Sequence, residues 1–326
     1  MTYNRDNKFP SLWLIYLFTP MQPGDHHSRL TQLLADINRI ILGKQEPVRM
    51  ALACLLAGGH LLIEDLPGVG KTTLAHTLAK LLGMNYQRIQ FTSDIFPADI
   101  IGASVFDSKN HEFKFHPGPI FNQMVLADEI NRSTPKAQSA LLEAMEEHQV
   151  TVEGVTYQLP EPFFVIATQN PSHQIGTFPL PESQLDRFLM RIELGYPDPK
   201  FERQLLTGQN RHLLIASLTA QLLSQDLQHI QNTIRKVHVS SALLDYCQAI
   251  INFTRESPEY HTGLSPRAGL ALLTAAKAWT FMDNRDAVIP EDIQAVLPAV
   301  AGHRLRSGNN DSVAIVAPIL AKVTVT

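Results

Sequence analysis

The spacing of hydrophobic positions divides the chain into three parts. From Leu30 to Ala57, apolar residues recur every three or four positions, which predicts helical structure. Between residues 60 and 195, short apolar runs alternate with helical patterns, and from about residue 200 the pattern is helical again. The apolar runs predict strands at residues 60–64, 86–91, 124–127 and 163–168. Short, continuously apolar strands that alternate with helices are typical of a parallel sheet covered on both faces, so we predict an α/β fold.

Local patterns refine the middle part of the chain. Helices are predicted over residues 71–82 and 135–147, and Thr134 is the expected N-cap of the second one. Residues 150–159 alternate around a central Glu-Gly pair and predict a β-hairpin. Residues 102–120 contain glycines, prolines and only short apolar pairs, so we expect an irregular excursion there.

A change of pattern near Pro197 predicts two domains. We expect residues 25–197 to form the α/β core and residues 198–326 to form a smaller all-α domain. At roughly 150 residues per domain, the 326 residues of the chain have room for both.

Residues 1–24 are expected to form a disordered extension outside the fold. Their apolar run, Leu12–Phe18, lies between Pro10 and Pro20 and is far shorter than the roughly 20 residues that cross a bilayer. Two other interpretations stay open, a short anchor at a membrane surface and a helix that binds in a groove of a partner. No other apolar run approaches the length of a membrane span.

Charge and cysteine content exclude several classes of protein. Lys and Arg total 27 and Asp and Glu total 31, so the net charge is −4 and no broad basic field favours non-specific binding to nucleic acid. Two cysteines are too few for a disulfide framework or a cysteine zinc site, which favours a cytoplasmic protein. The thirteen histidines lack the spacing of metal ligands. We interpret His60 as structural and the basic group His303, Arg304 and Arg306 as a solvated helix end.

The segment Asp65–Thr73, with the sequence DLPGVGKTT, lies between a predicted strand and a predicted helix and indicates a phosphate-binding loop. Glycines and a helix N-terminus let backbone N–H groups converge on phosphate oxygens. Lys71 would reach the β- and γ-phosphates of a bound nucleotide, and the Thr72 hydroxyl would bind Mg²⁺. Asp65 stands where the usual P-loop pattern has glycine, so the first turn departs from that pattern. The predicted nucleotide-binding residues of the loop are Pro67, Gly68, Val69, Gly70, Lys71, Thr72 and Thr73.

Two acidic residues, Asp128 and Glu129, end the apolar run that begins at Met124. A buried strand that ends in carboxylates places them beside the phosphates at the edge of the sheet. Asp128 would hold Mg²⁺ and Glu129 would polarise the attacking water. Asn170 follows the next strand, where a polar side chain would lie between the catalytic acid and the γ-phosphate. Together these residues predict a P-loop NTPase.

The order of these motifs resembles that of AAA+ ATPases, in which the counterpart of Asn170 is called sensor 1. The segment Leu180–Phe188 is similar to the AAA+ segment with the arginine finger, which the resemblance assigns to Arg187. Gly263–Ala268 resembles sensor 2, so Arg267 would face the γ-phosphate. Arg191, expected one helical turn after Arg187, is the rival finger, and Arg267 could instead pair with an acid.

Further motifs are similar to one AAA+ branch, the MoxR family, and the similarity covers residues 28–326. It implies a homo-oligomeric ring, by resemblance a hexamer, in which Arg187 completes the active site of a neighbouring subunit. It also implies ATP-driven remodelling of partner proteins, often alongside a partner with a von Willebrand factor A-type domain. The motifs are Leu126–Arg132, Ala140–Glu147, Ala167–Pro171, Leu185–Met190, Phe115–Phe121 and the hairpin at 150–159.

Two other functions stay open. A nucleic-acid-associated AAA+ motor is one, although the hairpin at 150–159 has no Lys or Arg to follow a phosphate backbone. A nucleotide-dependent regulator with negligible turnover is the other, and the intact pair of Asp128 and Glu129 argues against it.

Overall fold

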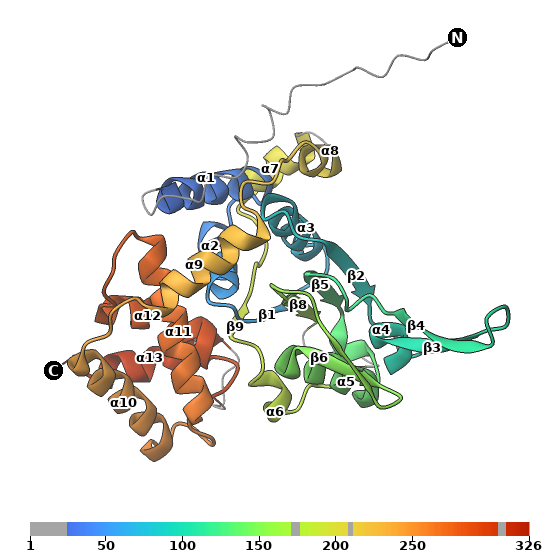
Figure 1. The fold of residues 1–326 in the computed structure, drawn as a ribbon. Coiled ribbons are helices and arrows are strands. Elements are labelled where there is room, and N and C mark those ends of the chain that lie inside the picture. The colour runs from blue at the N-terminus through green and yellow to red at the C-terminus, as the bar shows by residue number, and fades with distance from the viewer. Residues whose placement is uncertain (1–24, 171–176, 208–210, 306–310, 326) are drawn as a thin grey trace, which may run out of the picture.

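The computed structural model describes residues 25–170, 177–207, 211–305 and 311–325 (Figure 1). The prediction for residues 1–24 therefore lies outside the described residues. At the centre is a five-stranded sheet with the order β2-β5-β8-β1-β9, in which every neighbouring pair is parallel. This confirms the predicted α/β fold. The strands are β1 (Leu61–Glu64), β2 (Tyr86–Gln90), β5 (Met124–Asp128), β8 (Phe164–Gln169) and β9 (Met190–Ile192).

Side chains of the three inner strands, β5, β8 and β1, point alternately into two apolar clusters. In β5, Met124 and Leu126 join one cluster, while Val125 and Ala127 join the other. Both faces of the strand are thus buried, which explains its unbroken apolar run. On the first face lie α2 (Gln45–Leu56) and α3 (Lys71–Leu81), with α1 (Asp25–Ile40) packed on both; on the second lie α4 (Pro97–Ile101) and α5 (Pro135–Glu147). The helical pattern between Leu30 and Ala57 is interrupted between α1 and α2, where Gly43 has a φ of +71°.

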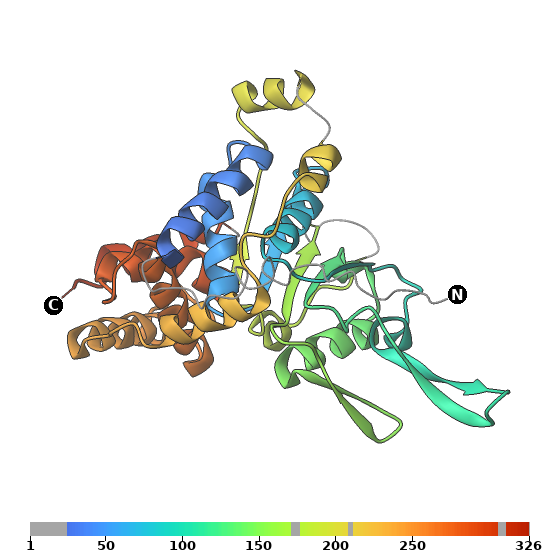
Figure 2. The same cartoon turned by 45° about the horizontal axis from the view of Figure 1, so that its top comes forward.

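Two hairpins project from the side of the molecule opposite to the last helices (Figure 2). The predicted one consists of β6 (Gln149–Val152) and β7 (Val155–Gln158), and it is confirmed. The other consists of β3 (Gly102–Asp107) and β4 (Glu112–Pro117), so the expected irregular excursion is wrong. Most of its side chains are at least partly exposed on both faces, which removes the regular apolar stripe that would have indicated strands. Phe115 stacks on Tyr157 with a centroid distance of 4.0 Å and joins the two hairpins.

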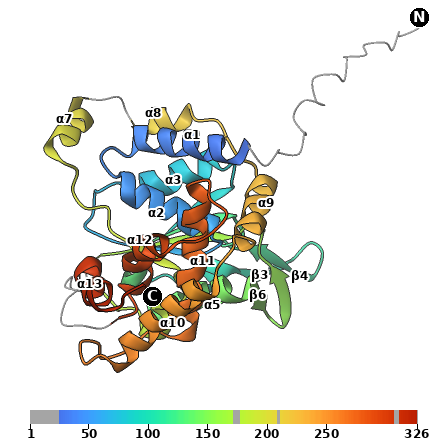
Figure 3. The same ribbon diagram turned by 90° about the vertical axis from the view of Figure 1, so that its left-hand side faces the viewer.

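After β9 the described residues form helices and no further strand, as predicted. The helices are α7 (Pro199–Thr207), α8 (Arg211–Ala216), α9 (Ser224–Arg235), α10 (Ser241–Glu256), α11 (Pro266–Met282), α12 (Pro290–Ala301) and α13 (Ser312–Lys322). However, α8 packs against α1 and α3 (Figure 3), and the N–H groups of Gln221 and Leu222 donate to Leu81 O. The first part of the predicted second domain thus lies on the nucleotide-binding part. The division at residue 197 stays a prediction.

The last five helices, α9–α13, are called the lid here. The first apolar cluster runs without a break from α1, α2 and α3 into α9, α11 and α12. Within this contact α9 and α11 pack on α2, and α12 packs on β9; the Arg49 guanidinium of α2 lies 4.0 Å from the centroid of Trp279 in α11. The lid is therefore packed on the same core as one face of the sheet. In the part of the chain that the structure describes, no helix combines the length and apolar character of a membrane span.

Candidate active site

The phosphate-binding loop connects β1 to α3 at the carboxyl edge of the sheet. Gly68 and Gly70 have φ values of +85° and +103°, and a Cβ added at either would meet nothing within 4 Å. Their backbone is therefore open to a ligand, at the N-terminus of a helix. The Lys71 side chain is buried and donates to Asp65 O (2.6 Å) and Leu66 O (3.2 Å). Burial lowers the pKa of Lys71, while the carboxylates of Asp65, Asp128 and Glu129 oppose the shift.

Asp65, which stands where the usual P-loop pattern has glycine, holds the loop in place by hydrogen bonds. Its carboxylate is buried and accepts hydrogen bonds from the backbone N–H groups of Leu66 (2.7 Å), Leu194 (2.6 Å) and Gly195 (2.6 Å). The loop is thereby tied to the segment that leaves β9 for the lid. Glycine has no side chain to make these hydrogen bonds. Asp65 therefore fixes the position of the loop, whereas glycine would leave the loop backbone more flexible.

The predicted magnesium ligand Asp128 lies at the end of β5, between two neighbours. Its Oδ1 accepts a hydrogen bond from the Thr168 hydroxyl (2.6 Å) on β8. Its Oδ2 accepts from Arg88 Nε (3.0 Å) and Nη2 (2.6 Å) on β2. Both carboxylate oxygens are thus oriented from the two flanking strands. Thr72 lines the same cavity as Asp128, and an oriented carboxylate together with a hydroxyl is a suitable donor set for a hard divalent cation.

Glu129 follows Asp128 in the left-handed region, with φ of +58°. A non-glycine residue there carries backbone strain, which is common at functional positions. Its Oε1 accepts from Asn170 Nδ2 (3.1 Å), and its Oε2 accepts from Gln90 Nε2 (3.0 Å) and lies 3.1 Å from Arg132. The structure thus brings the predicted catalytic acid and the predicted sensor into direct contact.

A cavity of about 330 Å³ brings most of the predicted residues together. Val69 is not among its lining residues and instead packs against the apolar cluster. Arg88 is an addition that the sequence reasoning missed. The lining residues are Pro67, Gly68, Gly70, Lys71, Thr72, Thr73, Arg88, Asp128, Glu129 and Asn170.

Arg187 and Arg267 do not line this cavity. Arg187 Nη2 lies 3.0 Å from Glu146 Oε2, and Arg267 Nη1 lies 3.1 Å from Glu146 Oε1. Arg187 also donates to Leu142 O (2.5 Å). Both arginines line a second cavity of about 300 Å³ between α5 and the lid, and they share one acid there. Within one chain, neither reaches the phosphate-binding loop.

Arg191, the rival finger, lies in β9, so the expectation that it follows Arg187 by one helical turn is wrong. Its side chain is only 10% exposed, and its Nη1 lies 2.7 Å from Glu64 Oε2 of the neighbouring strand. Its Nη2 donates to the Ser312 hydroxyl (2.5 Å). These contacts fix Arg191 inside the chain.

The interpretation of His303 and Arg304 as a solvated helix end is also wrong. The Arg304 side chain is 5% exposed and pairs with Asp186 at 2.6 Å. His303 Nε2 lies 3.1 Å from Phe188 O, and burial lowers the pKa of His303 well below its ordinary value. The apolar spacing of the surrounding segment hid these buried polar contacts. Arg306 lies outside the described residues.

Comparisons with known proteins agree with this geometry. Residues 60–190 match the ATPase family associated with various cellular activities (AAA), and residues 252–319 match the AAA lid domain. The protein YeaC of Bacillus subtilis, named as uncharacterized, is 46% identical over 281 residues, which are 86% of this chain and 88% of that protein. The chaperone MoxR1 of Mycobacterium tuberculosis is 40% identical over 286 residues, 85% of this chain and 75% of that protein. The chain belongs to the MoxR family of AAA+ ATPases.

A solved structure agrees with this assignment. The crystal structure of a candidate ATPase from Cytophaga hutchinsonii has a TM-score of 0.84 and 36% identity, and the match covers 93% of this MoxR-family chain and 97% of that one. The chain is thus an AAA+ ATPase that binds nucleotide with a divalent metal.

Several site residues of this MoxR-family ATPase were missed from the sequence. Arg88 and Gln90 are polar residues in a strand of a parallel sheet. Such strands are usually apolar, so these polar side chains could have indicated a functional role. Thr168 ends an apolar run in the same way as Asp128, but its hydroxyl was not considered. Glu146 and Asp186 gave no signal, because their partners are distant in sequence.

Proposed function

We propose that this chain is a MoxR-type chaperone ATPase that hydrolyses ATP with Mg²⁺ at sites completed between the subunits of a ring. The observation that carries the proposal is the division of the predicted machinery. One cavity holds the loop and the acids, while Arg187 lies in another cavity, against Glu146.

The residues of the first cavity have distinct roles. The loop backbone and Lys71 bind the phosphates, and Thr72 with Asp128 would hold Mg²⁺, which neutralises phosphate charge when bound. Glu129 orients the attacking water, and Asn170, 3.1 Å from Glu129, fixes the direction of that carboxylate. The donor set agrees with phosphoryl transfer by positioning and electrostatics.

Arg187 acts in trans in this proposal. Its side chain is 27% exposed, in contrast to the more deeply buried Arg191, so Arg187 is the better candidate for contact with another subunit. Arg267 shares Glu146 with it and is therefore proposed to act from the same face of the chain. Such a site is incomplete in a monomer. By family resemblance we expect a hexamer.

The work done by the ring is proposed to be the remodelling or activation of partner proteins, among which a von Willebrand factor A-type protein is a candidate. The name of the MoxR1 relative supports a chaperone role, and the net charge of −4 agrees with a protein partner. Cys54 and Cys247 are buried and form no disulfide, as expected of a protein that works in the reducing cytoplasm.

The proposal is tested with two variants. Glu129→Gln should bind ATP with unchanged affinity. Its turnover should fall about 100-fold or more, because the general base is removed. Arg187→Ala should also bind ATP and lose about 10³-fold, since transition-state charge is no longer compensated. Turnover and ATP affinity are measured by phosphate release and by equilibrium binding.

A mixing experiment shows where Arg187 acts. Lys71→Ala subunits do not hydrolyse ATP but keep their own Arg187, so adding them to Arg187→Ala subunits should partly restore turnover. No recovery at any mixing ratio would contradict a finger in trans. Turnover of the unmodified protein should not respond to double-stranded DNA, and a salt-dependent stimulation would favour the nucleic-acid motor.

A further inference from the structure

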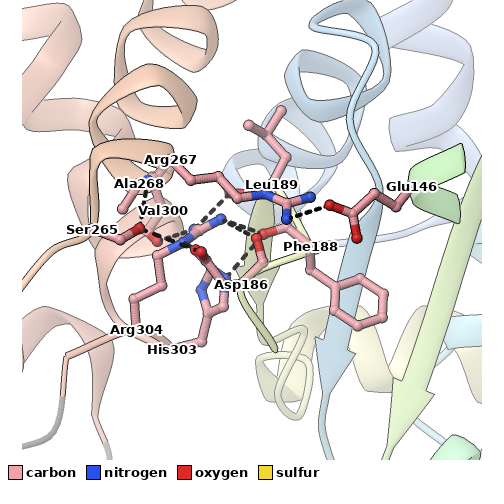
Figure 4. Close-up of polar contacts among 10 residues, drawn as sticks. All are labelled: Glu146, Asp186, Phe188, Leu189, Ser265, Arg267, Ala268, Val300, His303 and Arg304. Carbon is pink, nitrogen blue, oxygen red and sulfur yellow. Dashed lines mark hydrogen bonds and ion pairs between the residues drawn. The ribbon is translucent and has the colours of Figure 1, made fainter. Parts of the chain in front are cut away.

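Arg304 contacts the turn that carries Arg187, although the two residues are far apart in sequence. The turn lies between α6 (Glu182–Leu185) and β9. Arg304 Nε donates to Asp186 Oδ1 (2.6 Å), and its Nη2 donates to Asp186 O (3.2 Å) and Phe188 O (2.7 Å). Its Nη1 donates to Leu189 O (3.1 Å). One lid side chain therefore contacts the residues on both sides of Arg187 (Figure 4).

The chemistry of these contacts requires a guanidinium. Arginine presents five donors in one rigid plane, whereas lysine presents three donors from a single nitrogen. Arg304 follows α12 and also donates to Val300 O in the last turn of that helix, so the same plane connects the lid to the turn. His303 adds a second donor, because Phe188 O can only accept from His303 Nε2.

Asp186 also connects the turn of Arg187 to α11, the helix that carries Arg267. Its Oδ2 lies 3.3 Å from the Ser265 hydroxyl, which caps α11 by accepting from Ala268 N (3.0 Å). Arg267 lies in the first turn of that helix. The ion pair between Asp186 and Arg304 therefore lies between the turn of Arg187 and the helix start of Arg267. Arg267 points to Glu146 (Figure 4), and Arg187 pairs with the same acid.

We propose that Arg304 and Asp186 are positioning residues, which fix the turn of Arg187 to the lid so that Arg187 and Arg267 are presented to the neighbouring nucleotide as one unit. The inference rests on the proposed role of Arg187 in trans. The pair touches no residue of the chain's own nucleotide cavity, so its effect on turnover passes through the neighbouring active site.

Arg304→Lys tests the pair, since it keeps the charge and loses the planar fork. ATP affinity should stay within about twofold, while turnover should fall about 100-fold through misplacement of Arg187. Lys71→Ala subunits keep Arg187 and Arg304. Mixing them with Arg304→Lys subunits should restore the same fraction of unmodified turnover as mixing them with Arg187→Ala subunits. The double variant Arg187→Ala/Arg304→Lys should be no slower than Arg187→Ala alone, because both changes remove one function.

Arg285→Lys is the matched control. Arg285 also belongs to the lid and pairs with a buried acid, Asp292, but contacts no residue of the Arg187 turn. The turnover of Arg285→Lys should stay within about twofold of that of the unmodified protein. In a double variant the fold-changes of Arg285→Lys and Arg187→Ala should multiply.

The outcomes separate the two proposals. If Arg187→Ala recovers on mixing but Arg304→Lys keeps full turnover or does not recover, the positioning role is overturned and the finger stands. If the double variant is slower than Arg187→Ala, Arg304 acts elsewhere and the positioning role is again overturned. If Arg187→Ala itself does not recover, the finger in trans fails and the positioning role fails with it. Should Arg304→Lys not fold, Asp186→Asn, which keeps the acceptor and removes the charge, is subject to the same criteria.

Discussion

Single polar residues in this protein connect elements that apolar packing alone would leave loosely aligned. His60 is the simplest example, because it is buried at the start of β1 and reaches two other elements. Its Nδ1 accepts from Val165 N (3.0 Å) of β8, and its Nε2 lies 3.2 Å from Met145 O of α5. An imidazole that accepts at Nδ1 and donates at Nε2 must be neutral. The structural interpretation of His60 thus agrees with its contacts.

The pH dependence of stability should report this neutral His60. Burial lowers its pKa from 6.5 to about 4, so between these values the unfolded chain binds a proton that the folded chain does not. The free energy of unfolding should be unaffected by His60 above pH 6.5 and should fall as the pH drops, by about 2 kcal/mol at pH 5. We expect His60→Gln, compared by urea unfolding at pH 7 and pH 5, to lose about 2 kcal/mol less than the unmodified protein over that interval. An equal loss would contradict the assignment, and His303 remains in both proteins as a constant background.

At the scale of the element, the hairpin of β3 and β4 depends on a close crossing at its base. Gly102 has a φ of +96°, and a Cβ there would lie 2.3 Å from His116 O and 2.6 Å from Gly118 N. Both atoms belong to the backbone, so neither can move without opening the hairpin. Position 102 therefore requires glycine for two reasons, the close approach of these backbone atoms and the positive φ.

Gly102→Ala should therefore lower the free energy of unfolding by about 2–3 kcal/mol, the sum of backbone strain and steric overlap. Gly154→Ala is the matched control, because Gly154 has a φ of +81° at the turn of the other hairpin and a Cβ there meets nothing within 4 Å. Only the strain remains in that variant, so about 1 kcal/mol is expected. Equal losses in denaturant unfolding would show that the crossing is not tight.

At the scale of the whole molecule, the lid and the nucleotide-binding part share one apolar cluster through α2 and α11. Trp279 of α11 is 7% exposed and lies against Arg49 of α2, so its environment reports that contact. Arg304 is a second contact between the two parts, because it pairs with Asp186 beside Arg187.

We expect the lid to unfold together with the sheet. In a Trp13→Phe variant, which leaves Trp279 as the single tryptophan, the thermal midpoint from fluorescence should coincide with that from far-ultraviolet circular dichroism. The reason is that opening the α2–α11 contact exposes the core under the sheet. An earlier fluorescence midpoint would show that the lid separates first.

The sequence by itself determined the local features of this protein. Continuous apolar runs predicted the central strands because both of their faces are buried, and the loop DLPGVGKTT with Asp128, Glu129 and Asn170 predicted the nucleotide site because these residues follow strands of one sheet edge. The hairpin of β3 and β4 was missed, since a strand that is largely exposed on both faces has no one-sided apolar stripe.

Only the tertiary structure decided which polar groups meet. Asp65 binds Leu194 and Gly195, and Arg304 binds the turn of Arg187, each across more than a hundred residues, while Arg88 binds Asp128 across 40 residues. The sequence contains the side chains of each pair, but not their distance, because that distance depends on the order of the strands in the sheet and on how the lid packs against the sheet. For the same reason Arg304, which reads as a solvated helix end, is a buried residue that binds the Arg187 turn.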